Sequence, residues 1–167
     1  NGFYSDLTAS QTKAEDVPLE FVNGQFAMDF EEFERRISID THSFILCNPH
    51  NPTGTVHSPA ELASLAALAE EHDVRVVADE IHAPVVYPGG PVFTPYLTVP
   101  GGERGFSVFS PSKGWNLAGL KSALAMAGPC AVDDFRRLHE VHAHGSSHIG
   151  AIAHVAAISR STTYISL

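Results

Sequence analysis

The stretch SPSKGWNLAGLK, residues 110–121, decides how this sequence is interpreted. It follows a short apolar run, residues 106–109, that is typical of a buried strand, and a second apolar run follows it. A lysine directly after a buried strand is unusual, because burying an unpaired ammonium group is costly. Burial also makes such an amine a better nucleophile or Schiff-base former. Taken alone, an exposed loop is still the simpler interpretation of Lys113.

Composition limits the class of protein. The chain has 167 residues, 44% of them hydrophobic, which is enough for one domain with a core. Its formal net charge of -9 argues against nucleic acid or an anionic membrane as a partner. The sequence shows neither an apolar run that could span a bilayer nor the pattern of a signal peptide. Cys47 and Cys130 are predicted to be reduced core thiols of a cytoplasmic protein.

The ten histidines do not indicate a metal site. They form no His-Glu-x-x-His pattern of the kind that binds zinc on a helix. His139, His142 and His144 are close in sequence, but only the first two would share a helical face. Solvated surface is the favoured interpretation of this cluster, and no metal is expected.

Apolar runs and turn signals alternate along the chain. Ser58-Pro59-Ala60-Glu61 is the clearest helix start, because Ser58 can cap, Pro59 suits the first position and Glu61 completes a capping box. The other helices are predicted over 30–37, 132–144 and 147–159. Strands are predicted over 16–22, 43–47, 74–78, 105–110 and 121–127, the first demoted towards an edge by its proline.

This alternation predicts an α/β fold with a mostly parallel sheet covered on both faces. Ligands of such sheets bind at the carboxyl ends of the strands. Three polar clusters, 48–54, 79–82 and 110–113, follow predicted strands. Neighbouring parallel strands would bring the three clusters together, so the sequence predicts a binding site at this edge.

The residue types in these clusters suit pyridoxal phosphate. A lysine can condense with its aldehyde, an aspartate can hold its pyridine nitrogen protonated, an asparagine can donate to its phenolate oxygen, and a serine with a second cation can hold its phosphate. Each residue also has a simpler explanation: a cap for Asp79, a turn former for Asn51, a core histidine for His82 and a surface cation for Lys121. Their coincidence at three strand ends favours a site.

Three stretches resemble a known family: CNPHNPTG at 47–54, ADEIHAPVVYPG at 78–89 and SPSKGWNLAGLK at 110–121. They resemble the class I/II aminotransferase family of fold-type I pyridoxal-phosphate enzymes, and more closely its bacterial cystathionine β-lyase (C–S lyase) branch. The likeness runs from about residue 16 to 159. It implies a three-layer α/β/α sandwich in which residues 1–167 form part of the large, cofactor-binding domain.

The resemblance assigns roles to the residues around the cofactor. Lys113 becomes the Schiff-base lysine and the base that moves the Cα proton. Asp79 pairs with the pyridinium nitrogen, and Asn51 hydrogen-bonds the phenolate oxygen. Ser110 and Lys121 contact the phosphate.

Two residues, at separate positions, favour the lyase branch. His82 stands where many aminotransferases carry a tyrosine beside the phenolate oxygen, and Trp115 follows the lysine. The implied reaction is α,β-elimination from L-cystathionine or another cysteine conjugate, giving a thiol, pyruvate and ammonia. An aminotransferase and a non-catalytic fragment are the alternatives. The resemblance also implies an amino-acid substrate and a homodimer for the full-length enzyme.

The sequence departs from the family in length. Family members are about twice as long or more, and the glycine-containing phosphate loop, the aromatic residue that stacks on the ring and the small domain are not found. The chain begins without methionine, and residues from about 160 do not look like the family, so we expect a piece of a longer protein with weak cofactor binding. Residues 1–22 are predicted not to join the sheet, whose four other strands should be contiguous.

Overall fold

The structure is a computed structural model that describes residues 12–139 and 145–160 of the chain. The chain divides into two compact units, Asn1–Asp40 and Thr41–Leu167. The larger unit contains all three polar clusters, so it carries the candidate site.

The smaller unit holds a hairpin and a helix. Strands β1 (Glu20–Val22) and β2 (Gln25–Ala27) pair antiparallel, with Phe21 opposite Phe26 and their ring centroids 4.8 Å apart. Asn23 and Gly24 both have positive φ, as a tight hairpin turn requires. Helix α2 (Phe30–Arg36) follows. The predicted strand over 16–22 is therefore wrong in its first half, since only its last three residues pair and they pair within the hairpin.

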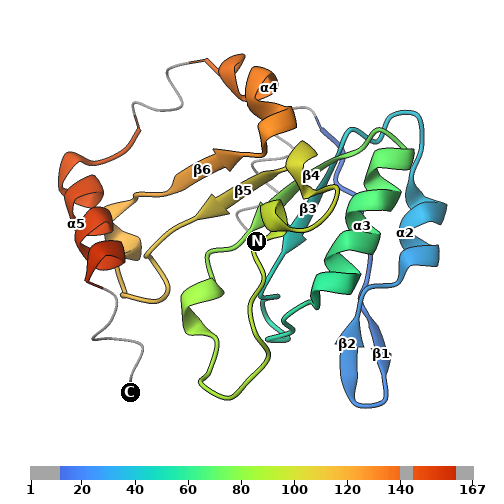
Figure 1. The fold of residues 1–167 in the computed structure, drawn as a ribbon, viewed down its shortest axis with the longest axis horizontal. Coiled ribbons are helices and arrows are strands. Elements are labelled where there is room, and N and C mark those ends of the chain that lie inside the picture. Colours follow the sequence, from blue (N-terminus) through green and yellow to red (C-terminus); the bar gives the residue numbers. More distant parts are fainter. Residues whose placement is uncertain (1–11, 140–144, 161–167) are drawn as a thin grey trace. The chain divides into compact units, whose positions relative to one another are not determined.

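The larger unit is built on a four-stranded sheet (Figure 1). Strands β3 (Ser43–Cys47), β4 (Arg75–Asp79) and β5 (Phe106–Phe109) are parallel, and β6 (Leu124–Ala127) runs antiparallel to β5. The order β3-β4-β5-β6 confirms the predicted contiguous, mostly parallel arrangement. As expected, β1 is not a strand of this sheet, while residues 1–11 of that prediction lie outside the described residues.

Helix α3 (Pro59–Glu71) begins as the sequence predicts. The Ser58 side chain accepts from the Glu61 amide at 3.2 Å, and the Glu61 carboxylate accepts from the Ser58 amide at 2.8 Å. The apolar side of the helix is buried and contacts β4; it consists of Leu62, Leu65, Ala66 and Ala69.

The two faces of the sheet are covered unequally in the described part of the chain. Successive strand residues point to opposite faces, and Val76 and Ala78 of β4 are buried while Val77 and Asp79 are only half-buried. Ile45 of β3 is 38% exposed. The sequence predicts a parallel sheet covered on both faces, whereas the described residues bury one face at its centre, in β4, and leave Leu124 at the β6 edge of that face 46% exposed.

The connections differ in detail from the predictions. The segment after β4 contains three 3-10 turns, Ala83–Val85, Tyr96–Thr98 and Gly102–Arg104. Strand β6 starts three residues later than predicted, after Lys121 adopts a left-handed conformation with φ 49°. Helix α4 spans Val132–Arg136 and α5 spans His148–Ser159, while residues 140–144 of the longer predicted helix lie outside the described residues.

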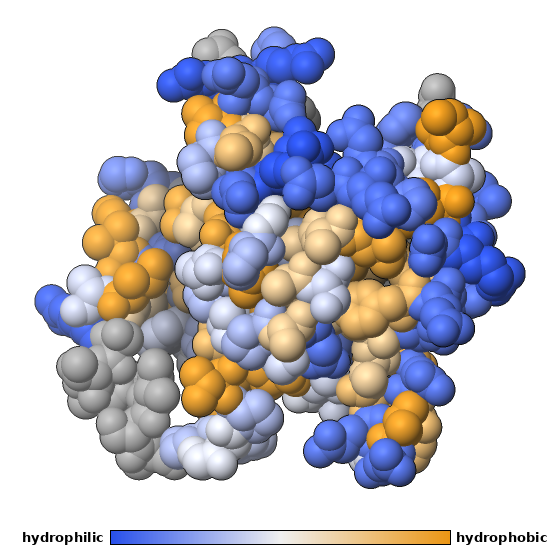
Figure 2. Space-filling model, turned by 45° about the vertical axis from the view of Figure 1, so that its right-hand side comes forward, coloured by the Kyte–Doolittle hydropathy of each residue, from blue (hydrophilic) through white to orange (hydrophobic). Residues whose placement is uncertain are grey.

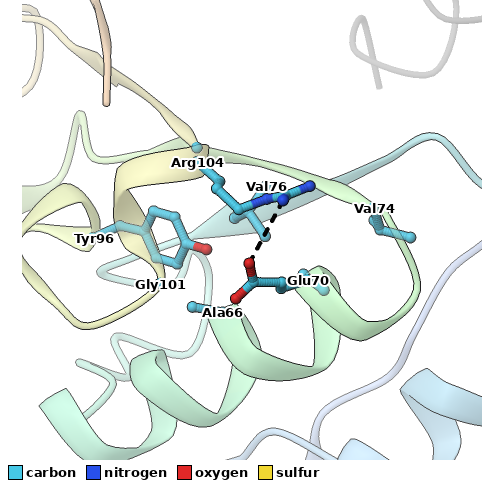
Figure 3. A pocket seen from close by; sticks show the side chains of 9 residues that line it. Ala66, Glu70, Val74, Val76, Tyr96, Gly101 and Arg104 are labelled. Atoms are coloured by element: carbon cyan, nitrogen blue, oxygen red, sulfur yellow. Dashed lines mark ion pairs between the residues drawn. The ribbon is translucent and has the colours of Figure 1, made fainter. Parts of the chain in front are cut away.

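A small cavity of about 10 Å³ lies between α3 and the 96–105 segment (Figure 3). Arg104 pairs with Glu70 across it, with 3.5 Å between Nη1 and Oε1. The buried ring of Tyr96 forms one wall, and burial raises its pKa to about 12. The space holds about one water molecule, so we interpret it as a packing gap.

On the face shown in Figure 2, hydrophilic side chains gather in groups with separate hydrophobic patches between them. None of the described helices is long and apolar enough to cross a membrane.

Helix α5 buries Gly150, His154 and Ala157, yet its other side is also apolar and exposed, at Ile149, Ile152, Val155 and Ile158. A helix that is apolar on more than one side is typical of a buried position in a larger structure.

Candidate functional site

The ends of the three parallel strands lie side by side, as the sequence predicts. The Asn48 amide donates to the Asp79 carbonyl at 3.0 Å, which joins the end of β3 to the end of β4. The Glu80 amide donates to the Val108 carbonyl at 2.9 Å, which joins β4 to β5. The three polar clusters therefore begin at one edge of the sheet.

Asn48 holds the first cluster in shape. Its side chain is buried, accepts from the His57 amide at 3.1 Å and donates to the Thr94 carbonyl at 3.4 Å. The Asn51 amide donates to the Cys47 sulfur at 3.4 Å. These contacts fix the backbone of the loop, and Asn51 remains exposed at its tip.

A cleft of about 310 Å³ opens beside this loop. Asn51 and His82, from two different clusters, both line it, together with the apolar side chains of Val56, Val85 and Val86. Among the described residues, the buried Nδ1 atom of His82 has no hydrogen-bond partner. Buried polar atoms are nearly always paired, so this nitrogen is a candidate for a hydrogen bond to a bound group.

His50 also lines the cleft, and the sequence argument did not single it out. Its Nδ1 lies 2.9 Å from the Thr53 hydroxyl, and burial lowers the pKa of the ring. A neutral imidazole at the cleft wall can either donate or accept a hydrogen bond. Its place between the two prolines of CNPHNPTG, in the same loop as Asn51, could have marked it as a site residue.

Asp79 ends β4 and is half-buried. Its Oδ1 accepts from the Ile81 amide at 3.2 Å, so the simpler interpretation of Asp79 as a local cap is correct for that oxygen. This contact also fixes the orientation of the carboxylate at the strand end.

Glu80 is a buried carboxylate that the sequence analysis passed over. Its Oε1 accepts from the Tyr96 amide at 2.6 Å, and its Oε2 accepts from the Ser107 hydroxyl at 2.5 Å. Burial raises the pKa of Glu80, and the neighbouring charge of Asp79 adds to the shift. Glu80 thus ties the turn after Asp79 to β5 and to the 96–98 turn.

Lys113 lies in a turn and is exposed. The Trp115 amide donates to the Pro111 carbonyl at 3.0 Å, and the Leu117 amide donates to the Ser112 carbonyl at 3.1 Å. The exposure agrees with the simpler interpretation of Lys113 as a loop residue, since β5 ends at Phe109 and only Ser110 and Pro111 of the following residues are buried before the lysine.

The turn that carries Lys113 contacts the segment directly after the second cluster. A Cβ atom at Gly114 would lie 2.5 Å from the Cβ of Pro84, so the glycine packs against the proline ring more closely than a larger residue could. Pro84 follows His82 by two residues. The structure thus brings the Lys113 turn against the segment that places His82 in the cleft.

Ser110 and Lys121 are linked through Ser122. The buried Ser110 hydroxyl donates to the Ser122 carbonyl at 2.7 Å and accepts from the Ser112 amide at 3.2 Å. Lys121 precedes Ser122 and is exposed. Of the predicted site residues, Asn51 and His82 share the cleft lining, whereas the others lie outside that lining; these are Asp79, Ser110, Lys113 and Lys121.

The cysteines and the possible metal-binding side chains were also predicted from the sequence. Cys47 and Cys130 are both free, but Cys130 is exposed, so its prediction as a core thiol is wrong. Within residues 12–139 and 145–160, no three histidine, cysteine, aspartate or glutamate side chains cluster closely enough to hold a metal. His142 and His144 lie outside the described residues.

The fold and the strand-end clusters define an α/β protein whose site lies at the carboxyl edge of a mostly parallel sheet. The family model described as "Aminotransferase class I and II" matches residues 3–166. The chain therefore belongs to this family, and the match extends beyond residues 16–159, the range expected from the motifs.

Individual relatives and a solved structure agree with this membership. The chain is 56% identical over 115 residues to a Mycobacterium tuberculosis (strain ATCC 25618 / H37Rv) protein named "Putative cystathionine beta-lyase", covering 69% of this chain and 28% of that one. It is 35% identical over 126 residues to "Cystathionine beta-lyase" of Corynebacterium glutamicum, covering 75% of this chain and 34% of that one. A solved Corynebacterium diphtheriae structure, described as a putative PLP-dependent beta-cystathionase, superposes with a TM-score of 0.84 at 32% identity. The match covers 98% of this chain and 42% of that one.

The chain spans about a third of the length of these curated relatives. The fold class predicted from the sequence is confirmed, since the structural neighbours are fold-type I enzymes and the sheet is mostly parallel.

Proposed function

We propose that this chain carries part of the pyridoxal-phosphate site of a C–S β-lyase that acts on L-cystathionine or a related cysteine conjugate. The convergence of the three polar clusters at one sheet edge is the observation that carries this proposal. Family membership and the names of the relatives support it.

The residues present fit the cofactor. His82, whose buried Nδ1 has no partner among the described residues, and the exposed Asn51 both line one cleft, where their side chains would hydrogen-bond a phenolate oxygen. Asp79 supplies a carboxylate at the neighbouring strand end, where it would hold the pyridine nitrogen in its protonated form. Ser110 and Lys121, linked through Ser122, are the proposed phosphate ligands. The Ser110 hydroxyl donates to a carbonyl here and can rotate towards a phosphate oxygen.

Lys113 would do the covalent and acid–base work. Its exposed amine, on a turn packed against Pro84, would hold the cofactor through its aldehyde and, once displaced by the substrate amine, would be free to take the proton from the substrate Cα. Pyridoxal phosphate, when bound, supplies an electron sink for the charge left on Cα. Breaking of the Cβ–S bond then releases the thiol, and hydrolysis gives pyruvate and ammonia.

An aminotransferase is the second candidate, favoured by the family to which the chain belongs. The same lysine would then move the Cα proton without loss of a thiol, and the substrate amino group would finally pass to a keto acid. His82, in place of the tyrosine expected in many aminotransferases, favours elimination.

Product analysis separates these candidates. The purified protein is incubated with pyridoxal phosphate and L-cystathionine, with no keto acid present, and pyruvate and free thiol are measured. Equal amounts of both products support the lyase. Turnover that appears only after a keto acid is added contradicts it and supports the aminotransferase. Cofactor binding without either reaction supports a non-catalytic fragment.

The assembly and location of the whole protein are part of the same proposal. We propose a cytoplasmic homodimer for the full-length enzyme. The exposed apolar side of α5 supports burial against further protein. Sedimentation of the full-length protein at several concentrations tests this, and a monomer throughout would contradict the dimer.

A further inference from the structure

A buried histidine on α5 contacts the segment that carries the proposed phosphate ligands. His154 is 7% exposed, and its Nδ1 lies 3.0 Å from the Ser122 hydroxyl. Its ring also packs near Phe109, the last residue of β5, with 6.0 Å between ring centroids. In Figure 1, α5 lies beside the turn that joins β5 to β6.

Ser122 connects this histidine to both proposed ligands. Its carbonyl accepts from the Ser110 hydroxyl at 2.7 Å, and its amide nitrogen is bonded covalently to Lys121. A displacement of Ser122 would therefore move both groups at once.

Lys121 needs support from its surroundings. Its φ of 49° is in the left-handed region, which residues other than glycine adopt only when their neighbours hold them there. On one side, the Leu120 carbonyl packs so closely on Gly150 of α5 that a Cβ atom at that glycine would overlap it. On the other side, Ser122 bonds to His154. Gly150 and His154 are four residues apart, so one face of α5 holds both neighbours of Lys121.

We propose that His154 is a positioning residue for the cofactor phosphate. Through its hydrogen bond to Ser122, it fixes the backbone at Lys121 and beside Ser110, from which the Lys121 ammonium and, after rotation, the Ser110 hydroxyl would bind the phosphate. This inference rests on the proposed function, because it assumes that Ser110 and Lys121 are the phosphate ligands.

Two ligands distinguish positioning from general support of the fold. The purified protein is titrated with pyridoxal 5'-phosphate and with pyridoxal, which lacks the phosphate, and both dissociation constants are followed by absorbance. His154→Phe keeps an aromatic ring near Phe109 and removes the hydrogen bond. We expect it to weaken pyridoxal 5'-phosphate binding by about tenfold, the scale of one lost hydrogen bond, and to leave pyridoxal binding unchanged.

Further variants complete the test. Ser122→Ala removes the partner hydroxyl but keeps the carbonyl that Ser110 uses, and it should give the same loss. The double variant should be no weaker than either single variant, because both break one bond. His154→Asn, which can place a nitrogen near that of the ring, should recover part of the affinity. Ser159→Ala, on the exposed side of the same helix, is the matched control and should bind as the unchanged protein does.

The outcomes distinguish a failure of the positioning role of His154 from a failure of the proposed function. If the unchanged protein prefers pyridoxal 5'-phosphate and both His154→Phe and Ser122→Ala keep that preference, the positioning role is wrong and the proposed function stands. Equal weakening of both ligands would reduce His154 to a structural residue and also overturn the inference. If the unchanged protein shows no preference for the phosphorylated ligand, the phosphate assignment in the proposed function fails and the inference fails with it.

Discussion

Gly114 packs against Pro84 so closely that a Cβ atom at the glycine would lie 2.5 Å from the Cβ of the proline. This contact joins the turn that carries Lys113 to the segment that carries His82. Neither residue was a predicted site residue, yet the relative position of two polar clusters depends on their approach.

Gly114→Ala should therefore displace the Lys113 turn. A separation under 3.0 Å cannot be accommodated without movement, and the ring of Pro84 is rigid. We expect a clear loss of pyridoxal-phosphate affinity, with a smaller effect on the thermal midpoint, since the turn is at the surface. Gly119→Ala is the control, because a Cβ atom there meets nothing within 4 Å. Equal affinities of the two variants would refute the role of this contact.

Asp79→Asn separates the cap from the charge. The amide keeps an oxygen that can accept from the Ile81 amide, so folding stability should change little. It removes the negative charge that would keep a pyridine nitrogen protonated, so turnover should fall by orders of magnitude. Asp79→Glu should be milder, since the charge survives. Thermal unfolding and lyase rates measured on the same samples check this, and an active Asp79→Asn would leave Asp79 as a cap alone.

Glu80 should make stability depend on pH. Its pKa is raised in the folded state, so the folded protein binds this proton more strongly than the unfolded chain does. The contribution is fully present below the unfolded pKa and is lost as pH rises through the folded pKa. Glu80→Gln keeps an oxygen for the Tyr96 amide and has no proton to lose. Urea unfolding at a series of pH values above 4.5 should therefore show a shallower decline for this variant.

Glu80→Ala tests the same carboxylate by removal. It leaves the buried Tyr96 amide without its acceptor, which costs about 1–3 kcal/mol of unfolding free energy. The loss should exceed that of Glu80→Gln at every pH. Identical pH profiles for the unchanged protein and Glu80→Gln would show that Glu80 does not titrate in this range.

The sequence predicted the elements whose signals are local. The capping box at Ser58, the apolar run of β3 and the turn at Asn23 each lie within a few residues, and the structure confirms them. The sequence also predicted that the strand-end clusters lie together, because the carboxyl ends of neighbouring parallel strands meet at one edge of the sheet. The family resemblance came from three short motifs and is confirmed by the family match.

Features that depend on distant contacts were not predictable in this way. Glu80 is buried because Ser107 and Tyr96 lie opposite it, and neither is near it in sequence. His154 and Ser122 are 32 residues apart. Lys113 is exposed although Ser110 and Pro111 shortly before it are buried, and no local pattern in the sequence separates these residues. The site roles of Asn51, Asp79, His82, Ser110, Lys113 and Lys121 stay predictions.

The central claim is that Lys113 holds the cofactor, and covalent labelling tests it most directly. The chain has three lysines, Lys13, Lys113 and Lys121, so the outcome is easily assigned. The purified protein is mixed with pyridoxal phosphate, reduced with borohydride, digested and examined by mass spectrometry. The account predicts a phosphopyridoxyl group on Lys113 and its loss in Lys113→Ala. Labelling confined to Lys13 or Lys121, or labelling that persists undiminished in Lys113→Ala, would contradict it.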